Sequence, residues 1–329
     1  MMTRSKWAAR MPFGPLRIFA TGVAMGVADV IPGVSGGTMA FILGIYAYLL
    51  NAIKSFNLDV ARLLLQFKLK AALDQVPWQF LLVLLAGIGS AVFTLAHVVS
   101  WLLVHQTILL FAFFFGLILA SILAIGATVR WSVSTIVALI VGTVVAYLIV
   151  GLVPLDMPHD PLTLLLSGMV AIMAMILPGI SGSFILLILG QYEFALNAVK
   201  TLDIVSIMAL GTGAMIGIMG FARVLSWLLR HYHQATVAML VGFMIGSLRK
   251  IWPWKETVRT MIDRHGVEVP LLQHNVLPDL SSPEFFAALA LCLLGFLIVT
   301  LIDHVQSKSN PLFRLVRRNR READVVAAD

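Results

Sequence analysis

Two short runs of serine, threonine and glycine interrupt an otherwise apolar chain, and their residue types could bind an anion. Each run directly follows a Pro-Gly-containing break at which a helix ends, so each run would open a new helix. The start of a helix offers unpaired N–H groups and the positive end of the helix dipole. Small side chains also let a ligand approach the backbone. The predicted anion-binding residues are Ser35, Gly36, Gly37 and Thr38 in the first run, and Ser181, Gly182 and Ser183 in the second.

Three ionisable residues lie inside apolar segments, where a charged group is costly and is therefore a functional candidate. Arg223 suits an anionic head group, because a guanidinium is always charged and can make two contacts with one phosphate. Alternatively, it extends to the membrane surface or pairs with an acid. Asp29 and Glu193 are candidates for coupling transport to a proton or to sodium. The alternative for Asp29 is that it caps a helix or pairs with a base.

These candidates belong to a motif that the chain contains twice. Residues 29–38 (Asp-Val-Ile-Pro-Gly-Val-Ser-Gly-Gly-Thr) return as residues 175–184 (Met-Ile-Leu-Pro-Gly-Ile-Ser-Gly-Ser-Phe). The similarity continues into later segments, where Gly116 and Ser121 match Gly242 and Ser247. The sequence therefore predicts an internal duplication. Its two predicted helix breaks are Pro32 with Gly33 and Pro178 with Gly179.

Composition places the chain among polytopic membrane proteins. Apolar residues make up 60% of the sequence and charged residues 12%, and the mean hydropathy is +0.97. The net charge of +7 lies mainly in the termini and loops, which indicates membrane orientation and contact with anionic lipid rather than with nucleic acid. The single cysteine, Cys292, excludes a disulfide framework.

The hydropathy pattern predicts an all-α fold in which each half is a re-entrant hairpin followed by about three transmembrane helices. In each hairpin the break joins two apolar arms, and the first arm, at roughly 24 Å, is too short to cross a core of about 30 Å. The predicted units are a basic head at 1–15, a first repeat at 16–155 (hairpin 16–53, spans within 78–153), a second repeat at 160–305 (hairpin 163–199, spans within 204–303) and a basic tail at 306–329.

An odd number of crossings in each half would turn the second copy upside down, which predicts an inverted-topology repeat. Basic residues in the head, the tail and the loop near Lys68 then fall on one side, which the positive-inside rule places in the cytoplasm together with both termini. Segment 249–282 departs from the rule, because it would lie outside although it carries five basic residues. The two hairpin tips would meet near the middle of the membrane.

Several chemistries lack their sequence signals. The chain has no phosphate-binding loop of the G-x-x-x-x-G-K-[ST] type for ATP hydrolysis and no aspartate-rich prenyltransferase motif. It also lacks a close His/Cys/Asp grouping for a metal. The sequence therefore predicts a transporter without a cofactor or metal, not an enzyme.

The doubled motif, with Leu-Gly-Ile-Tyr following its first copy, resembles the bacterial polyprenyl-phosphate transporter family, formerly a membrane domain of unknown function. The resemblance covers about residues 12–305. It implies a flippase of the bacterial cytoplasmic (inner) membrane that returns undecaprenyl phosphate from the outer to the inner leaflet for peptidoglycan and other cell-wall synthesis. It also implies that the two serine-glycine runs hold the phosphate head group.

Two alternatives remain open from the residues. One is a secondary transporter or channel for a small soluble anion, which would need an aqueous vestibule where a lipid carrier needs a lateral opening. The other is a scaffolding membrane protein, in which replacing Ser35 and Ser181 by alanine would have no effect on the cell.

Overall fold

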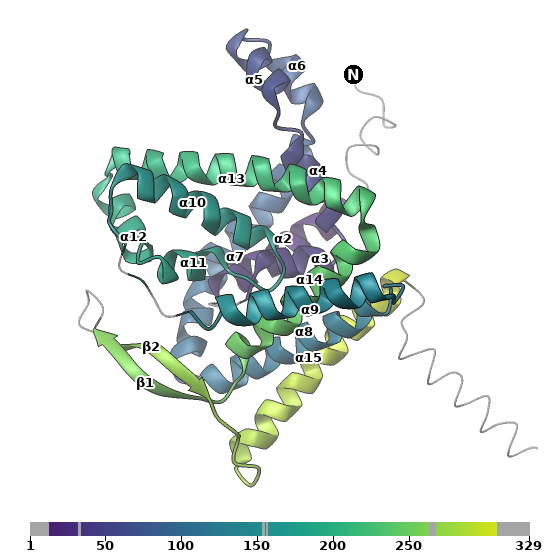
Figure 1. The fold of residues 1–329 in the computed structure, drawn as a ribbon, viewed down its shortest axis with the longest axis vertical. Helices are drawn as coiled ribbons and strands as arrows, with labels where there is room; N and C mark the ends of the chain where they lie inside the picture. Colours follow the sequence, from purple (N-terminus) through teal and green to yellow (C-terminus); the bar gives the residue numbers. More distant parts are fainter. Residues whose placement is uncertain (1–12, 32–33, 153–154, 156, 263–267, 308–329) are drawn as a thin grey trace, which may run out of the picture.

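The structure is a computed structural model that describes residues 13–31, 34–152, 155, 157–262 and 268–307. Pro32 and Gly33 of the first break lie outside the described residues, as do most of the predicted basic head and tail. The described chain is a bundle of helices with one two-stranded sheet at an end of the molecule (Figure 1).

The helices follow the predicted order in both halves, and most ends lie within a few residues of the expected ones. The first half contains α2 (Pro15–Val30), α3 (Gly36–Ile42), α4 (Tyr46–Lys54), α5 (Leu58–Leu65), α6 (Leu69–Gln75), α7 (Trp78–His105), α8 (Thr107–Gly126) and α9 (Val133–Ile149). The second half contains α10 (Pro161–Ile176), α11 (Gly182–Ile188), α12 (Tyr192–Thr201), α13 (Ile204–His231), α14 (His233–Ile251) and, after the strands, α15 (Pro283–Ser307).

The outgoing arm of each hairpin, predicted as one helix, is two helices. The chain bends by 119° between α3 and α4 and by 105° between α11 and α12. At the bends Gly44 and Gly190 adopt φ values of +75° and +69°, a left-handed conformation that glycine reaches without a steric penalty. The single-arm prediction was wrong because the first segment stays apolar through its bend, and the polar Gln191 and Glu193 after the second bend are also compatible with one continuous helix.

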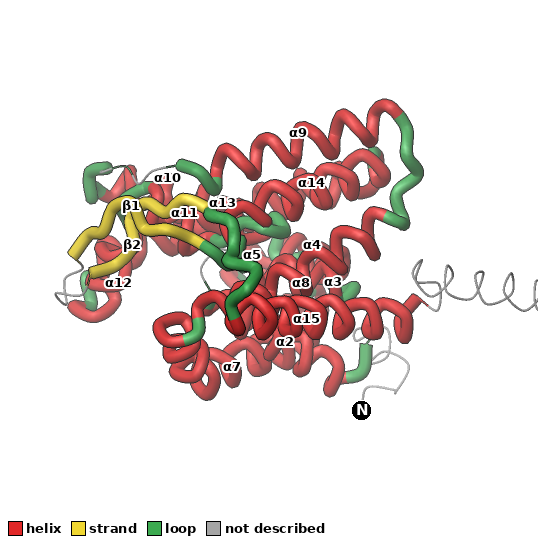
Figure 2. The backbone as a smooth tube through the Cα atoms, turned by 90° about the horizontal axis from the view of Figure 1, so that it is seen from below, coloured by secondary structure: helices red, strands yellow, loops and turns green. Residues whose placement is uncertain are grey.

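The all-α prediction is corrected by an antiparallel hairpin of β1 (Lys255–Ile262) and β2 (Glu268–Asn275). The β1 segment is rich in β-branched residues, which favours a strand. Both strands lie at the same end of the molecule as α12 (Figures 1 and 2).

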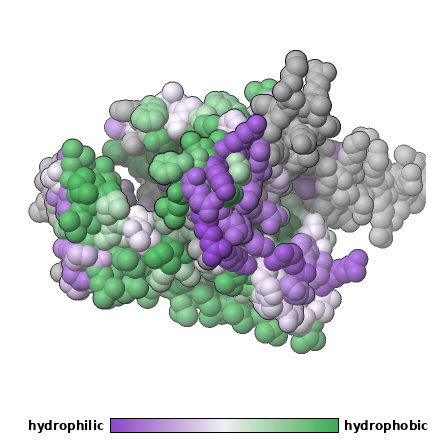
Figure 3. Space-filling view, turned by 90° about the horizontal axis from the view of Figure 1, so that it is seen from above, coloured by the Kyte–Doolittle hydropathy of each residue, from purple (hydrophilic) through white to green (hydrophobic). Residues whose placement is uncertain are grey.

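Four helices in the described part are long and apolar enough to cross a membrane: α7, α8, α13 and α15. Of the other two predicted spans, α9 has 17 residues, or roughly 25 Å of helix, and α14 ends in Arg249 and Lys250. The surface seen in Figure 3 is largely apolar around a compact hydrophilic area. Helices, bends and surface together describe a multi-pass membrane protein.

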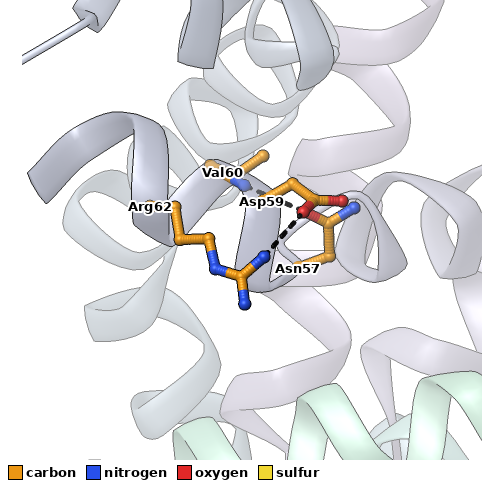
Figure 4. A network of polar contacts seen from close by, with 4 residues as sticks. All are labelled: Asn57, Asp59, Val60 and Arg62. Carbon is orange, nitrogen blue, oxygen red and sulfur yellow. Dashed lines mark hydrogen bonds and ion pairs between the residues drawn. The ribbon is translucent and has the colours of Figure 1, made fainter. Parts of the chain in front are cut away.

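The loop after the first hairpin folds into the short helices α5 and α6, which project from the bundle at the top of Figure 1. Asn57 opens α5 by accepting a hydrogen bond from the Val60 N–H at 2.9 Å, and Asp59 lies 3.8 Å from Arg62 (Figure 4). Both members of this ion pair are largely exposed, so the side-chain cap, not the ion pair, fixes the start of α5.

Helix pairing is reciprocal between the halves. Helix α2 packs along α7, and its counterpart α10 packs along α13. Helix α8 of the first half packs on α15 of the second, while α14, the counterpart of α8, packs on α9, the counterpart of α15. Such an exchange of partners is the pattern that an approximate two-fold axis between the halves produces.

Equivalent glycines bring these exchanged pairs together. A Cβ added to Gly116 of α8 would lie 1.9 Å from the carbonyl oxygen of Cys292 on α15. A Cβ added to Gly242, its repeat equivalent on α14, would lie 2.2 Å from the carbonyl oxygen of Leu139 on α9. Two backbones approach this closely only where a side chain is missing, as is common between membrane helices.

We expect Gly242→Ala to lower the thermal stability of the purified protein in detergent. The added methyl group would overlap a carbonyl, and overpacking of this kind costs about 1–3 kcal/mol. Gly220→Ala on α13 is the matched control, because nothing lies within 4 Å of its added Cβ. Gly220→Ala should leave the melting temperature unchanged or raise it, since alanine favours a helix over glycine. Equal melting temperatures for the two variants would contradict the close approach of α14 and α9.

Candidate functional site

The first predicted anion-binding run forms a closed tip. Ser35 precedes α3, and its hydroxyl oxygen accepts a hydrogen bond from the Gly37 N–H at 3.1 Å. The carboxylate of Asp29, at the end of α2, accepts one from the Gly36 N–H at 2.7 Å. Asp29 therefore caps α3 in this conformation, which is one of the two roles expected for it. The first two amides of the tip are thus already paired.

The two tips meet, as the sequence predicted, and three hydrogen bonds between described residues join the two sides. The carbonyls that end α10 accept two of them, from the hydroxyl of Ser35 to Met175 at 3.2 Å and from the hydroxyl of Tyr46 to Ile176 at 2.8 Å. Helix-terminal carbonyls lack partners within their own helix, so these donors satisfy them. In the opposite direction, the Gly179 N–H donates to the hydroxyl of Thr38 at 2.8 Å.

The junction of the tips is tightly packed and closed to solvent. Ser35 and Thr38 are fully buried, and Ser181 is 5% exposed. A Cβ on Gly37 would lie 2.8 Å from the Met175 carbonyl oxygen, so glycine is required at this contact. The structure brings Ser35 and Thr38 of the first run against the end of α10 and against Gly179, and in this conformation the polar groups of the two tips bind protein partners.

The second tip differs from the first at the position of Thr38. There the repeat has Phe184, while the hydroxyls of Ser181 and Ser183 lie 2.7 Å apart within hydrogen-bonding distance. Gly179 follows the buried Pro178 with φ +94°, and a Cβ there would lie 2.6 Å from the Ser247 hydroxyl. Helix α14 therefore supports the second break from behind, and the small residue permits this contact.

The remaining candidates lie away from the junction of the tips. Arg223 donates to the carbonyls of Met219 at 2.6 Å and Phe56 at 3.0 Å, and with Lys54 it lines a groove of about 390 Å³ beside α13. Glu193 lies in the first turn of α12, directly after the second bend. In the described residues, His, Cys, Asp and Glu side chains form no group of three or more that could hold a metal.

Sequence reasoning missed Tyr46, although a signal for it existed. The dipeptide Leu-Gly and the tyrosine two residues later occur in both repeats, as Gly44 with Tyr46 and as Gly190 with Tyr192. Helix α4 begins at Tyr46, directly after the bend at Gly44. The buried Tyr46 hydroxyl donates a hydrogen bond to the Ile176 carbonyl at the end of α10.

Three basic side chains that the sequence treated only as an exception to the positive-inside rule gather beside the second tip. Lys250, at the end of α14, has its ammonium 4.4 Å from the ring centroid of Phe184. Lys255, in β1, lies 4.6 Å from the ring centroid of Phe111 and donates to the carbonyl of Lys250. The guanidinium of Arg249 lies 4.3 Å from the ring of a tyrosine on α9. Burial, and secondly the charge of Lys250, lowers the pKa of Lys255 to about 7.

We expect the free energy of unfolding to rise between pH 7 and pH 10 through Lys255. In the folded protein this side chain loses its proton near pH 7, whereas in the unfolded chain it keeps the proton to near its ordinary pKa of 10.5. The unfolded state therefore binds more protons in this window, so stability increases with pH. The measurement is thermal unfolding in detergent of wild type and Lys255→Met across the window.

The difference between the two proteins isolates Lys255 from other titrating groups. The methionine variant should be the more stable at and below pH 7, and its advantage should shrink towards pH 10. A difference that does not change with pH would contradict the burial of this ammonium.

Comparison with known proteins places this architecture in a family. The family model for VCA0040-like, undecaprenyl phosphate translocase-like proteins matches residues 25–269, which include both tips. A polyprenyl-phosphate transporter of Vibrio cholerae is 45% identical over 264 residues, covering 80% of this chain and 86% of the relative. A polyprenyl-phosphate transporter of Staphylococcus aureus is 30% identical over 251 residues, covering 70% of this chain and 84% of the relative. No solved structure matches. The chain therefore belongs to the VCA0040-like, undecaprenyl phosphate translocase-like family of membrane proteins.

Proposed function

We propose that this protein is a flippase for a polyprenyl phosphate, undecaprenyl phosphate, in the bacterial cytoplasmic membrane. It returns the lipid from the outer to the inner leaflet, where the carrier is reused for peptidoglycan and other cell-wall polymers. The observation that carries the proposal is the meeting of two polar helix tips inside an apolar bundle, in a chain whose relatives are named polyprenyl-phosphate transporters. A lipid phosphate needs a polar route for its head while its chain stays in hydrocarbon.

The topology that fits this function is an inverted repeat with both termini in the cytoplasm. The reciprocal pairing of α8 with α15 and of α14 with α9 supports a two-fold relation between the halves. Counting α9 and α14 as spans, each half would have three spans and one re-entrant hairpin, an odd number of crossings, so the axis would lie in the membrane plane. Each tip then reaches the junction from a different side.

In the proposed mechanism the tips part and the phosphate replaces the bonds that they now make with each other. Three hydrogen bonds join the tips, at a net worth of about 1 kcal/mol each, or about 3 kcal/mol together. A ligand that binds the open form better than the closed one can overcome a difference of this size. The head group would take its contacts from Ser35, Gly36, Gly37, Thr38, Ser181, Gly182 and Ser183, and Arg223 would receive it at the groove beside α13.

Asp29 is the proposed point of coupling to a proton or to sodium, with Glu193 as the second candidate. The Asp29 carboxylate caps the first tip, so protonation or ion binding would weaken its bond to the Gly36 amide. That change would loosen the part of the hairpin that has to move. Transport would then depend on the ion that Asp29 binds.

The function is tested in proteoliposomes that carry fluorescent undecaprenyl phosphate. Wild-type protein should move the label between leaflets, measured with a membrane-impermeant quencher, whereas the neutral alcohol with the same chain should stay in place. Uptake of inorganic phosphate is measured in the same vesicles. Phosphate uptake without lipid movement would instead establish a transporter for a soluble anion. The absence of both activities would refute the proposal.

Replacement of Asp29 by asparagine should abolish the dependence of transport on pH or sodium. The asparagine oxygen can still accept the hydrogen bond from Gly36, so the variant removes the charge and keeps the cap. Asp29→Ala is the matched variant, because it removes both the charge and the cap. It should also lower the melting temperature, since the loss of a helix cap costs about 1 kcal/mol. An unchanged ion dependence in Asp29→Asn would exclude this residue from coupling.

A further inference from the structure

A cavity of about 790 Å³ lies between the end of α14, the end of α9 and the β1–β2 hairpin. Its basic wall contains Arg249, Lys250 and Lys255, and β2 adds His274. The mechanism outlined above does not use this cavity. It adjoins the second tip, because the Lys250 ammonium that lines it lies against the ring of Phe184 on α11.

The charges in this cavity lack a balancing acid. Among the described residues that line it there is no aspartate or glutamate, and its other polar side chains, which include Gln273 and Asn275, carry no charge. The ammonium groups of Lys250 and Lys255 face aromatic rings, which stabilise a cation far less than a carboxylate or phosphate would. Lys250 and Lys255 are partly buried, and holding cations there without a counter-ion is costly for folding, so an anion is the partner that the cavity lacks.

Apolar and aromatic side chains also line the cavity, beside its basic residues, and some of them reach the outside of the bundle. Phe115 of α8 and Leu248 of α14 are partly buried members of this lining. Tyr147 of α9 and Leu152, just after it, line the same cavity and are 50% and 54% exposed on the surface of the bundle. An anion with an attached hydrocarbon chain fits these surroundings better than a small soluble anion, because the chain can leave along the exposed residues into the membrane.

We propose that this cavity is a loading site that binds the phosphate monoester head of a polyprenyl phosphate before the head reaches the tips. The inference rests on the proposed function and adds to it a place where the substrate first binds. In the proposed topology the cavity opens on the outer side of the membrane, where the lipid to be returned is found. Lys250 connects the cavity to the second tip. The loading site would also give a function to basic residues of segment 249–282, which departs from the positive-inside rule.

The test is the double variant Lys250→Gln, Lys255→Gln, compared with wild type in binding and in the leaflet assay. Binding of fluorescent undecaprenyl phosphate should weaken at least about tenfold, because two charge-assisted contacts to the phosphate are lost. Transport at low substrate concentration should fall in parallel and recover partly at high concentration. Lys200→Gln, an exposed lysine on α12, is the matched control and should behave as wild type.

Two further probes identify the ligand and separate folding from binding. Inorganic phosphate should compete only weakly if the apolar wall holds the lipid chain, and the neutral alcohol should not bind measurably. Inorganic phosphate competing as well as the lipid would contradict the assignment to a lipid head group. The double variant should melt at or above the wild-type temperature at pH 7, because it removes uncompensated buried charge. A lower melting temperature would show a structural role and overturn the proposal.

The outcomes distinguish this inference from the function on which it rests. If wild-type protein moves the lipid and the double variant binds and moves it equally well, the loading site is wrong and the flippase stands. If wild-type protein fails to move the lipid, the proposed function fails, and the loading site fails with it.

Discussion

The arrangement of the whole molecule depends on the ends of two helices that satisfy each other's backbone groups. Helix α10 stops at Ile176 inside the bundle, and its last carbonyls would be unpaired in an environment without water. The hydroxyls of Ser35 and Tyr46 from the other half supply the missing donors, and Thr38 accepts in return from the amide of Gly179. A broken helix is tolerated inside a membrane only where such partners exist. The closed junction therefore explains why two copies of one motif have to face each other.

The same contacts explain how a duplicated chain became asymmetric. Thr38 in the first copy holds the amide of the second tip, and this position needs a hydroxyl. Its counterpart Phe184 has no hydroxyl that could accept such a bond, and its ring instead contacts the ammonium of Lys250. One tip therefore fastens the junction, while the other borders a basic cavity.

Much of the fold could be predicted from the sequence because helix breaks and long apolar runs leave local signals. Pro178 with Gly179 marked the end of α10, and the duplication predicted that the two tips would meet. The bend at Gly44 was missed, since a left-handed glycine between two apolar helices changes neither hydropathy nor length. The partners of the tip amides could not be predicted either. The bond between Thr38 and Gly179 joins residues far apart in the chain, and only the folded backbone brings them together.

The junction of the tips has to open if the phosphate is to bind there, and cross-linking the two sides measures whether it does. Cysteines replace Ser35 and Met175 in a Cys292→Ala background, and a short, reducible bifunctional thiol reagent joins them in proteoliposomes. We expect the cross-link to form in the resting protein, to stop movement of the labelled lipid and to release it on reduction, with transport measured relative to the untreated double-cysteine protein. Full transport with the cross-link in place would contradict the account.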